Sequence, residues 1–91
     1  MAARRLSIAG HVHNVGFRDW MVAQARALGL NGWVRNRADG TVEALIDGPE
    51  PAVEEMLRAC RYGPRSAVVD SIVEELAEAP AELGFLRLPT A

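Results

Sequence analysis

Residues 4–28 read RRLSIAGHVHNVGFRDWMVAQARAL, and this stretch predicts a strand that runs into a helix. From Arg4 to Val12, small or apolar residues take every second position, the spacing of a strand with one buried face: Leu6, Ile8, Gly10 and Val12. From about Phe17 to Leu28, apolar residues recur on one face of a helix: Phe17, Met21, Ala25 and Leu28. Gly29 is placed to stop this helix.

A hairpin follows the first helix. Its predicted arms are residues 32–36 and 41–47. Between the arms, Asp39-Gly40 supplies the positive φ that a tight turn requires. Residues of the second arm that alternate toward the interior are Val42, Ala44 and Ile46.

A second helix is marked by its ends and by its apolar stripe. Pro49 and Pro51 open it, because the first amides of a helix have no helical partner and tolerate proline. Gly63-Pro64 ends the pattern. The apolar residues at i, i+3, i+4 and i+7 are Val53, Met56, Leu57 and Cys60.

Two further strands complete the predicted order of elements. Residues 67–76 favour a strand, but Val69 and Ile72 both look buried, which requires a bulge between them. Residues 77–84 form a polar connection, and residues 85–88 suit a short edge strand. The order β-α-β-β-α-β plus a short last strand predicts an α+β fold, the ferredoxin-like sandwich, with an antiparallel sheet and both helices on one face.

Size, composition and charge limit the class of protein. The 91 residues, 49% hydrophobic and 24% charged, predict one globular domain over residues 1–91. A net charge of −2 argues against a general nucleic-acid binder, and no apolar run approaches the roughly 18 residues of a membrane span. The opening residues MAARR precede no apolar stretch, so we expect no signal peptide and a cytoplasmic location. Cys60 is alone, which rules out an internal disulfide.

The junction between the first strand and the first helix is the main candidate site. Within residues 10–18, Asn14 and Gly16 tolerate the left-handed conformation, so main-chain amides can converge at the positive end of the helix dipole. This predicts an anion cradle. Arg18 lies at the unfavourable end of the dipole, at a cost of about 0.3–1 kcal/mol, which makes sense if it closes over a bound dianion. The residues alone leave open that Arg18 pairs with Asp19 or another carboxylate.

Asn36 is the second candidate. It ends a predicted strand and shares the face of Val34, because side chains two residues apart in a strand point the same way. A carboxamide there can donate and accept hydrogen bonds at once, which suits holding a water molecule. An ordinary turn-flanking asparagine is the alternative that the residues leave open.

Other types of site fit the sequence less well. His11 and His13 could share a strand face, but no nearby cysteine or paired carboxylate completes a metal site. Gly16 is followed by Phe-Arg rather than Lys-Ser or Lys-Thr, which excludes a Walker-type loop. Trp20 and Trp33 could stack on bases, but we expect them to be core or half-buried residues. We therefore expect no metal, cofactor or nucleic acid.

Both candidate segments match motifs of a known family. Residues 10–18, GHVHNVGFR, resemble the acylphosphatase motif Gly-x-Val-Gln-Gly-Val-x-Phe-Arg. Residues 32–42, GWVRNRADGTV, match the second motif of that family, Gly-Trp-Val-x-Asn-x-x-Asp-Gly-x-Val. The segments Leu28-Gly29-Leu30 and Gly84-Phe85 also look familial. The resemblance covers nearly the whole chain, and the ferredoxin-like sandwich of the family agrees with the order of elements.

The resemblance implies an enzyme that hydrolyses acyl phosphates to a carboxylate and inorganic phosphate. It matches Arg18 to the arginine that binds the phosphoryl group and Asn36 to the asparagine that orients the attacking water. The residues matched to the main-chain phosphate cradle are His13, Asn14, Val15, Gly16 and Phe17. We expect a monomer that needs no metal.

Two residues of the loop depart from the family pattern. His13 and Asn14 stand where the family usually has Gln and Gly. Asparagine tolerates positive φ, so we expect the loop to keep its shape. The Asn14 side chain can still crowd the anion, which leaves an alternative: a module that binds phosphate or acyl phosphate with little or no turnover.

Overall fold

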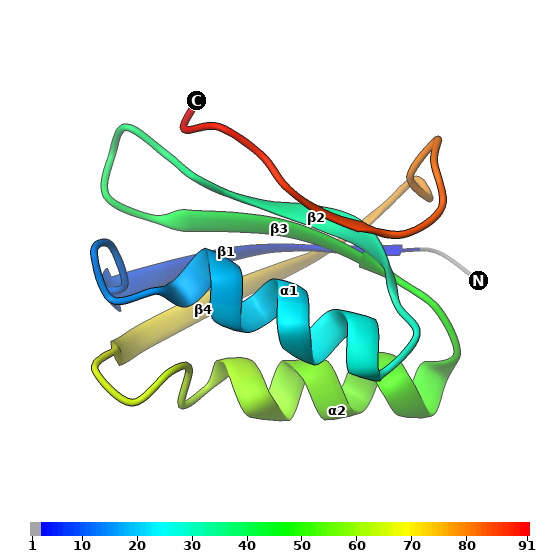
Figure 1. The fold of residues 1–91 in the computed structure, drawn as a ribbon, viewed down its shortest axis with the longest axis horizontal. Coiled ribbons are helices and arrows are strands. Elements are labelled where there is room, and N and C mark those ends of the chain that lie inside the picture. The colour runs from blue at the N-terminus through cyan, green and yellow to red at the C-terminus, as the bar shows by residue number, and fades with distance from the viewer. Residues whose placement is uncertain (1–2) are drawn as a thin grey trace.

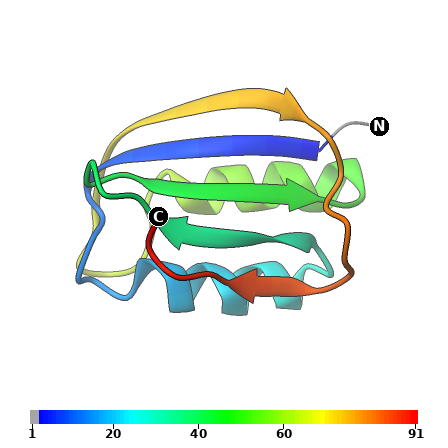
Figure 2. The ribbon, with the colours of Figure 1, turned by 90° about the horizontal axis from the view of Figure 1, so that it is seen from above.

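A five-stranded sheet with two helices on one face makes up the fold (Figures 1 and 2). The computed structural model describes residues 3–91. Residues 1–2, which belong to the expected 1–91 domain and to the MAARR segment, lie outside the described residues. The elements are β1 (Ala3–His11), α1 (Phe17–Ala27), β2 (Asn31–Asn36), β3 (Val42–Asp47), α2 (Glu50–Cys60), β4 (Val68–Ala77) and β5 (Phe85–Arg87). This order confirms the predicted ferredoxin-like α+β fold.

The strands lie in the order β4-β1-β3-β2-β5, so the short last strand is at an edge, as predicted. The first four strands pair antiparallel. The β5 strand, however, runs parallel to β2, with Gly32 opposite Phe85 and Val34 opposite Arg87. Residues 78–84 cross one end of the sheet from β4 to the opposite edge (Figure 2). As a result, β5 runs in the direction opposite to β4 and parallel to its neighbour β2. The sheet is therefore mixed rather than purely antiparallel.

A bulge distorts β4 where it passes the end of β1. Ala9 lies opposite Ser71 and Gly10 opposite Val69, which leaves Asp70 as the extra residue. This is the bulge that the pattern of β4 predicted. Gly10 has φ +130°, and a Cβ atom there would overlap the carbonyl oxygen of Val68. Glycine therefore lets β4 approach closely just before the chain leaves the sheet.

The core lies between the sheet and the helices. It includes the inward residues predicted for the second hairpin arm and most of the predicted helix stripes, whereas Leu28 and Leu57 are half-buried at its margin. Cys60 is fully buried, and burial raises the pKa of its thiol to about 12. Trp20 and Trp33 are half-buried, as expected. No helix within residues 3–91 is long and apolar enough to cross a membrane.

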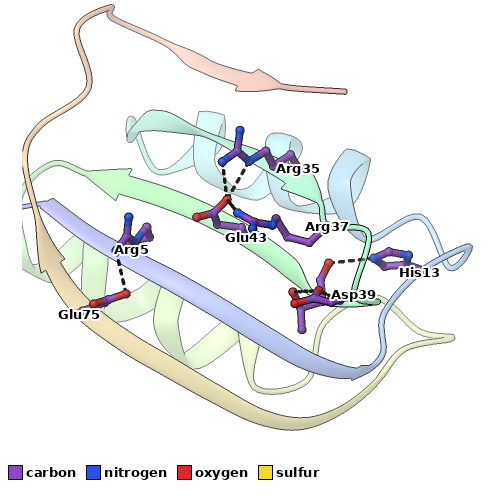
Figure 3. Close-up of polar contacts among 8 residues, drawn as sticks. Arg5, His13, Arg35, Arg37, Asp39, Glu43 and Glu75 are labelled. Atoms are coloured by element: carbon purple, nitrogen blue, oxygen red, sulfur yellow. Dashed lines mark hydrogen bonds and ion pairs between the residues drawn. The ribbon is translucent and has the colours of Figure 1, made fainter. Parts of the chain in front are cut away.

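Ion pairs cover the face of the sheet that the helices leave open (Figure 3). The Glu43 carboxylate lies 2.7 Å from an Arg35 nitrogen and 3.0 Å from Arg37 Nη1, and its side chain is only 13% exposed. Burial alone raises the pKa of Glu43, but the hydrogen bonds from both guanidinium groups outweigh it and hold the pKa below its ordinary value of 4.5.

Glu43→Gln is expected to reduce the acid sensitivity of the fold. A carboxyl whose pKa is lower when folded adds stability above its unfolded pKa and loses it as the pH falls through the folded pKa. We therefore expect the variant to be less stable by about 1 kcal/mol at neutral pH. The difference should shrink as the pH falls below the ordinary pKa of 4.5 and vanish once the pH lies below the folded pKa of Glu43. Urea unfolding from neutral to acid pH measures this. Glu75→Gln, which breaks the more exposed pair with Arg5, is the control and should have a smaller effect. Parallel pH profiles for wild type and Glu43→Gln would contradict the prediction.

Candidate active site

Four segments contribute to one site: the 12–16 loop (residues 12–16, between β1 and α1), the start of α1, the end of β2 and the end of β5. A cavity of about 200 Å³ lies among them. It is lined by Val12, Asn14, Gly16, Phe17, Arg18, Asp19, Asn36 and Arg87. The structure thus brings the two side chains singled out in the sequence, Arg18 and Asn36, to one cavity.

The 12–16 loop has the backbone shape expected of an anion cradle. Asn14 has φ +60°, and Gly16 has φ +77° and begins α1 as its N-cap without a side-chain hydrogen bond. Within the described residues, none of the amides of residues 13–17 donates to another main-chain group. These amides belong to the loop that borders the cavity and to the start of a helix, where unpaired N–H groups and the helix dipole both favour an anion.

The Arg18 side chain belongs to the cavity rather than to a surface ion pair. Its Nη1 donates to the carbonyl oxygen of Leu88 at 3.3 Å. Among residues 3–91, no carboxylate pairs with Arg18, and Asp19 instead contacts Arg87 Nη1 at 2.6 Å. A guanidinium has several further N–H donors, so Arg18 keeps hydrogen-bonding capacity for a ligand in the cavity.

Asn36 lines the same cavity and carries an unsatisfied acceptor. The residue is 9% exposed, and its Oδ1 is buried with no hydrogen-bond partner in the part of the chain that the structure describes. Its main-chain oxygen, in contrast, accepts from the amide of Ala91 at 3.0 Å. A buried acceptor without a partner is destabilising and needs a reason, and a ligand-binding role supplies one.

Three of the five loop candidates line the cavity, namely Asn14, Gly16 and Phe17, but His13 and Val15 do not. The His13 Nε2 instead donates to the main-chain oxygen of Thr41 at 2.8 Å, and Val15 packs against the core. His11 is exposed, and among residues 3–91 no group of three or more His, Cys, Asp or Glu is placed to hold a metal ion.

The ion pair between Asp19 and Arg87 was missed by sequence analysis, although both residues line the cavity. An acidic residue in the first turn of a helix is a recognisable signal, and Asp19 follows Arg18 directly. Arg87 gives no such signal, because it reaches the site only through the parallel pairing of β5 with β2.

A larger cavity of about 310 Å³ lies on the open face of the sheet. Its lining includes Arg5 paired with Glu75 and Arg37 paired with Glu43. These pairs neutralise each other, and Asp39 adds a further carboxylate to the lining, so the cavity offers no net attraction for an anion. The smaller cavity at the 12–16 loop is therefore the better candidate for binding an anion.

Comparisons with known proteins agree on one family. The acylphosphatase family model matches residues 4–85. A protein from Acidiphilium cryptum (strain JF-5) named acylphosphatase is 62% identical over 90 residues, which cover 99% of each chain. The crystal structure of acylphosphatase from Bacillus subtilis matches with a TM-score of 0.90 at 32% identity, covering 97% of this chain and 99% of that one. Full-length HypF, in a phosphate- and nucleotide-bound form, matches with a TM-score of 0.89 at 26% identity, covering 98% of this chain but 12% of its own.

Proposed function

The chain belongs to the acylphosphatase family, and from that premise we propose how it hydrolyses the carboxyl-phosphate anhydride of an acyl phosphate. Family membership makes it a hydrolase of this class. The assignment of residues is the proposed part: Arg18 and the amides of residues 13–17 hold the phosphoryl group, and Asn36 holds the attacking water.

The chemistry asks for little catalytic machinery. The water oxygen bonds to phosphorus, the bond from phosphorus to the acyl oxygen breaks, and the electron pair leaves with the carboxylate. One water proton passes to solvent or to the phosphate product. A carboxylate is a weak base, so its departure needs no general acid. The transition state is mainly loose, with charge on the equatorial oxygens, so positioning and electrostatic stabilisation do most of the work.

Arg18 and the loop amides suit those oxygens. The guanidinium presents a planar fork that matches two oxygens at once. Amides at a helix N-terminus add donors that are already oriented, so no reorganisation is needed as charge develops. Arg18 lies at the positive end of the dipole of α1, which is unfavourable for a cation. Binding of a dianion there offsets this unfavourable interaction.

The observation that carries the proposal is that Asn36 lines the cavity and that its buried Oδ1 has no hydrogen-bond partner among residues 3–91. An acceptor in that position can take a hydrogen bond from a water and orient its lone pair toward phosphorus. The attacking water and the leaving group lie on opposite sides of phosphorus, roughly in line. If the water binds at the buried Asn36, the acyl group leaves on the solvent side.

We further propose that the protein acts as a single domain over residues 1–91, as a monomer in the cytoplasm, without nucleic acid. No metal is required, because Arg18 and the loop amides supply the positive charge that the phosphoryl oxygens need.

A phosphate-release assay with benzoyl phosphate tests the function. We expect turnover by the wild-type protein and competitive inhibition by inorganic phosphate. An alkyl phosphate monoester is the control substrate and should not be hydrolysed, because its alkoxide leaving group needs an acid that this cavity lacks. Absence of both turnover and competition would defeat the proposal and favour a purely structural role.

The alternative is a domain that binds phosphate or acyl phosphate with little or no turnover. The likeness to full-length HypF favours it, since the matching part is only 12% of that chain and the HypF structure is phosphate- and nucleotide-bound. Competition by inorganic phosphate without release of phosphate from benzoyl phosphate would select this alternative.

A further inference from the structure

The His13 side chain joins the 12–16 loop to the turn between β2 and β3 (Figure 3). Its Nε2 donates to the main-chain oxygen of Thr41 at 2.8 Å in a half-buried contact. The same oxygen accepts from the amide of Arg37, also at 2.8 Å, and a carbonyl oxygen can accept both bonds. One oxygen therefore links the loop to the residue that directly follows Asn36.

The turn that carries this oxygen is held firmly. Asp39 Oδ1 accepts from the Thr41 hydroxyl at 2.7 Å and from the Thr41 amide at 3.0 Å. The Gly40 amide donates to the oxygen of Arg37 at 3.1 Å. The Thr41 oxygen is thus a fixed anchor, and a side chain bound to it is fixed as well.

The loop needs such an anchor. Asn14, the neighbour of His13, holds a left-handed conformation, which asparagine tolerates better than other non-glycine residues but less readily than glycine. The amides of residues 13–17 have no main-chain acceptor within the described residues to hold them in place. His13 forms the one side-chain hydrogen bond of the 12–16 loop in the described part of the chain.

We propose that His13 is a positioning residue that keeps the 12–16 loop in its anion-binding shape by bonding to Thr41. The inference rests on the proposed function, since the anion is the phosphoryl group of the substrate. Without the bond, a smaller fraction of molecules has the competent loop, and the apparent Kd rises by the inverse of that fraction. The affinities for inorganic phosphate and for acyl phosphate fall by the same factor. The enzyme–substrate complex, once formed, reacts at the same rate as in wild type.

Four variants test this role, the fourth only if the first does not fold. For His13→Ala we expect the Kd of inorganic phosphate and the KM of benzoyl phosphate to rise together by about 3–10-fold, with kcat within about twofold of wild type. His13→Gln keeps a donor that can reach Thr41 and should stay within about twofold in all three quantities. His11→Ala removes the exposed histidine and is the matched control. Should alanine prevent folding, His13→Met keeps bulk without the donor.

A double-mutant cycle tests the route through Thr41. Asp39→Ala loosens the turn, so its effect on phosphate affinity should be smaller in the His13→Ala background than in wild type. Additive effects would mean that His13 does not act through the turn.

The measurements separate this inference from the proposed function. Wild-type phosphate affinity in His13→Ala, or failure of glutamine to restore affinity, overturns the positioning role even if wild type hydrolyses benzoyl phosphate. Weaker phosphate binding in His13→Ala, with no hydrolysis by wild type, supports the positioning role and defeats the proposed function.

Discussion

Arg18→Ala is expected to lower kcat/KM for benzoyl phosphate by at least about 10²–10³-fold, the typical cost of removing one electrostatic donor from a preorganised site. The variant loses the guanidinium proposed to hold the phosphoryl oxygens, so the Ki of inorganic phosphate should rise as well. Arg18→Lys keeps the charge but not the planar fork, and we expect an intermediate loss. Steady-state kinetics with phosphate as inhibitor measure both effects.

The matched control is Arg26→Ala on the same helix. Arg26 also donates to a main-chain oxygen near the C-terminal end of the chain, that of Phe85, at 3.0 Å from Nη2, but it does not line the cavity. Loss of Arg26 should change stability and leave kcat/KM within about twofold, as expected for a side chain outside the site. Near wild-type turnover in Arg18→Ala, or equal losses in both variants, would contradict the assigned role of Arg18.

Arg18→Ala should change the stability of the fold only slightly, although its activity falls strongly. A cation in the first turn of α1 opposes the helix dipole by about 0.3–1 kcal/mol. Its hydrogen bond to Leu88, at 3.3 Å, is long and recovers only part of this. We therefore expect the free energy of unfolding to change by less than about 1 kcal/mol, so that lost activity cannot be ascribed to unfolding.

Much of the fold follows from local patterns. The alternation of β1 and the helical stripe of α1 are set by side chains near in sequence, which is the information that periodicity carries. Even the bulge at Asp70 was predictable, because Val69 and Ile72 can face one core only if a residue is inserted between them. The parallel pairing of β5 was not, since it depends on which end of the sheet residues 78–84 cross.

The candidate site was also predictable only where it depends on local residue types. Asn14 and Gly16 take the left-handed conformations that their residue types suggested, and Arg18 and Asn36 line one cavity. The contact of Arg87 with this cavity depends on strand pairing between distant segments. The bond from His13 to Thr41 depends on the shape of a turn that no local pattern specifies.

Asn36→Ala is expected to lower kcat by at least about 10²–10³-fold while leaving phosphate affinity nearly intact. In the proposed mechanism the lost carboxamide orients water rather than the phosphoryl group, so the Ki of inorganic phosphate should change by no more than about threefold. This combination distinguishes Asn36 from Arg18, whose removal should weaken phosphate binding. Kinetics of benzoyl phosphate hydrolysis, with phosphate inhibition measured in parallel, provide both numbers.

Asn31→Ala in the same strand is the matched control for Asn36→Ala. Asn31 Oδ1 accepts from the amide of Gly84 at 2.7 Å, so its loss should cost about 1 kcal/mol of stability and leave kcat unchanged. Asn36 Oδ1 is buried and has no partner within the part of the chain that the structure describes. Its removal relieves an unsatisfied acceptor, so Asn36→Ala should lose little stability. A water-holding role therefore predicts that Asn36→Ala lowers kcat strongly but changes the stability of the fold little. A kcat for Asn36→Ala near that of wild type would mean that the water is held by another group.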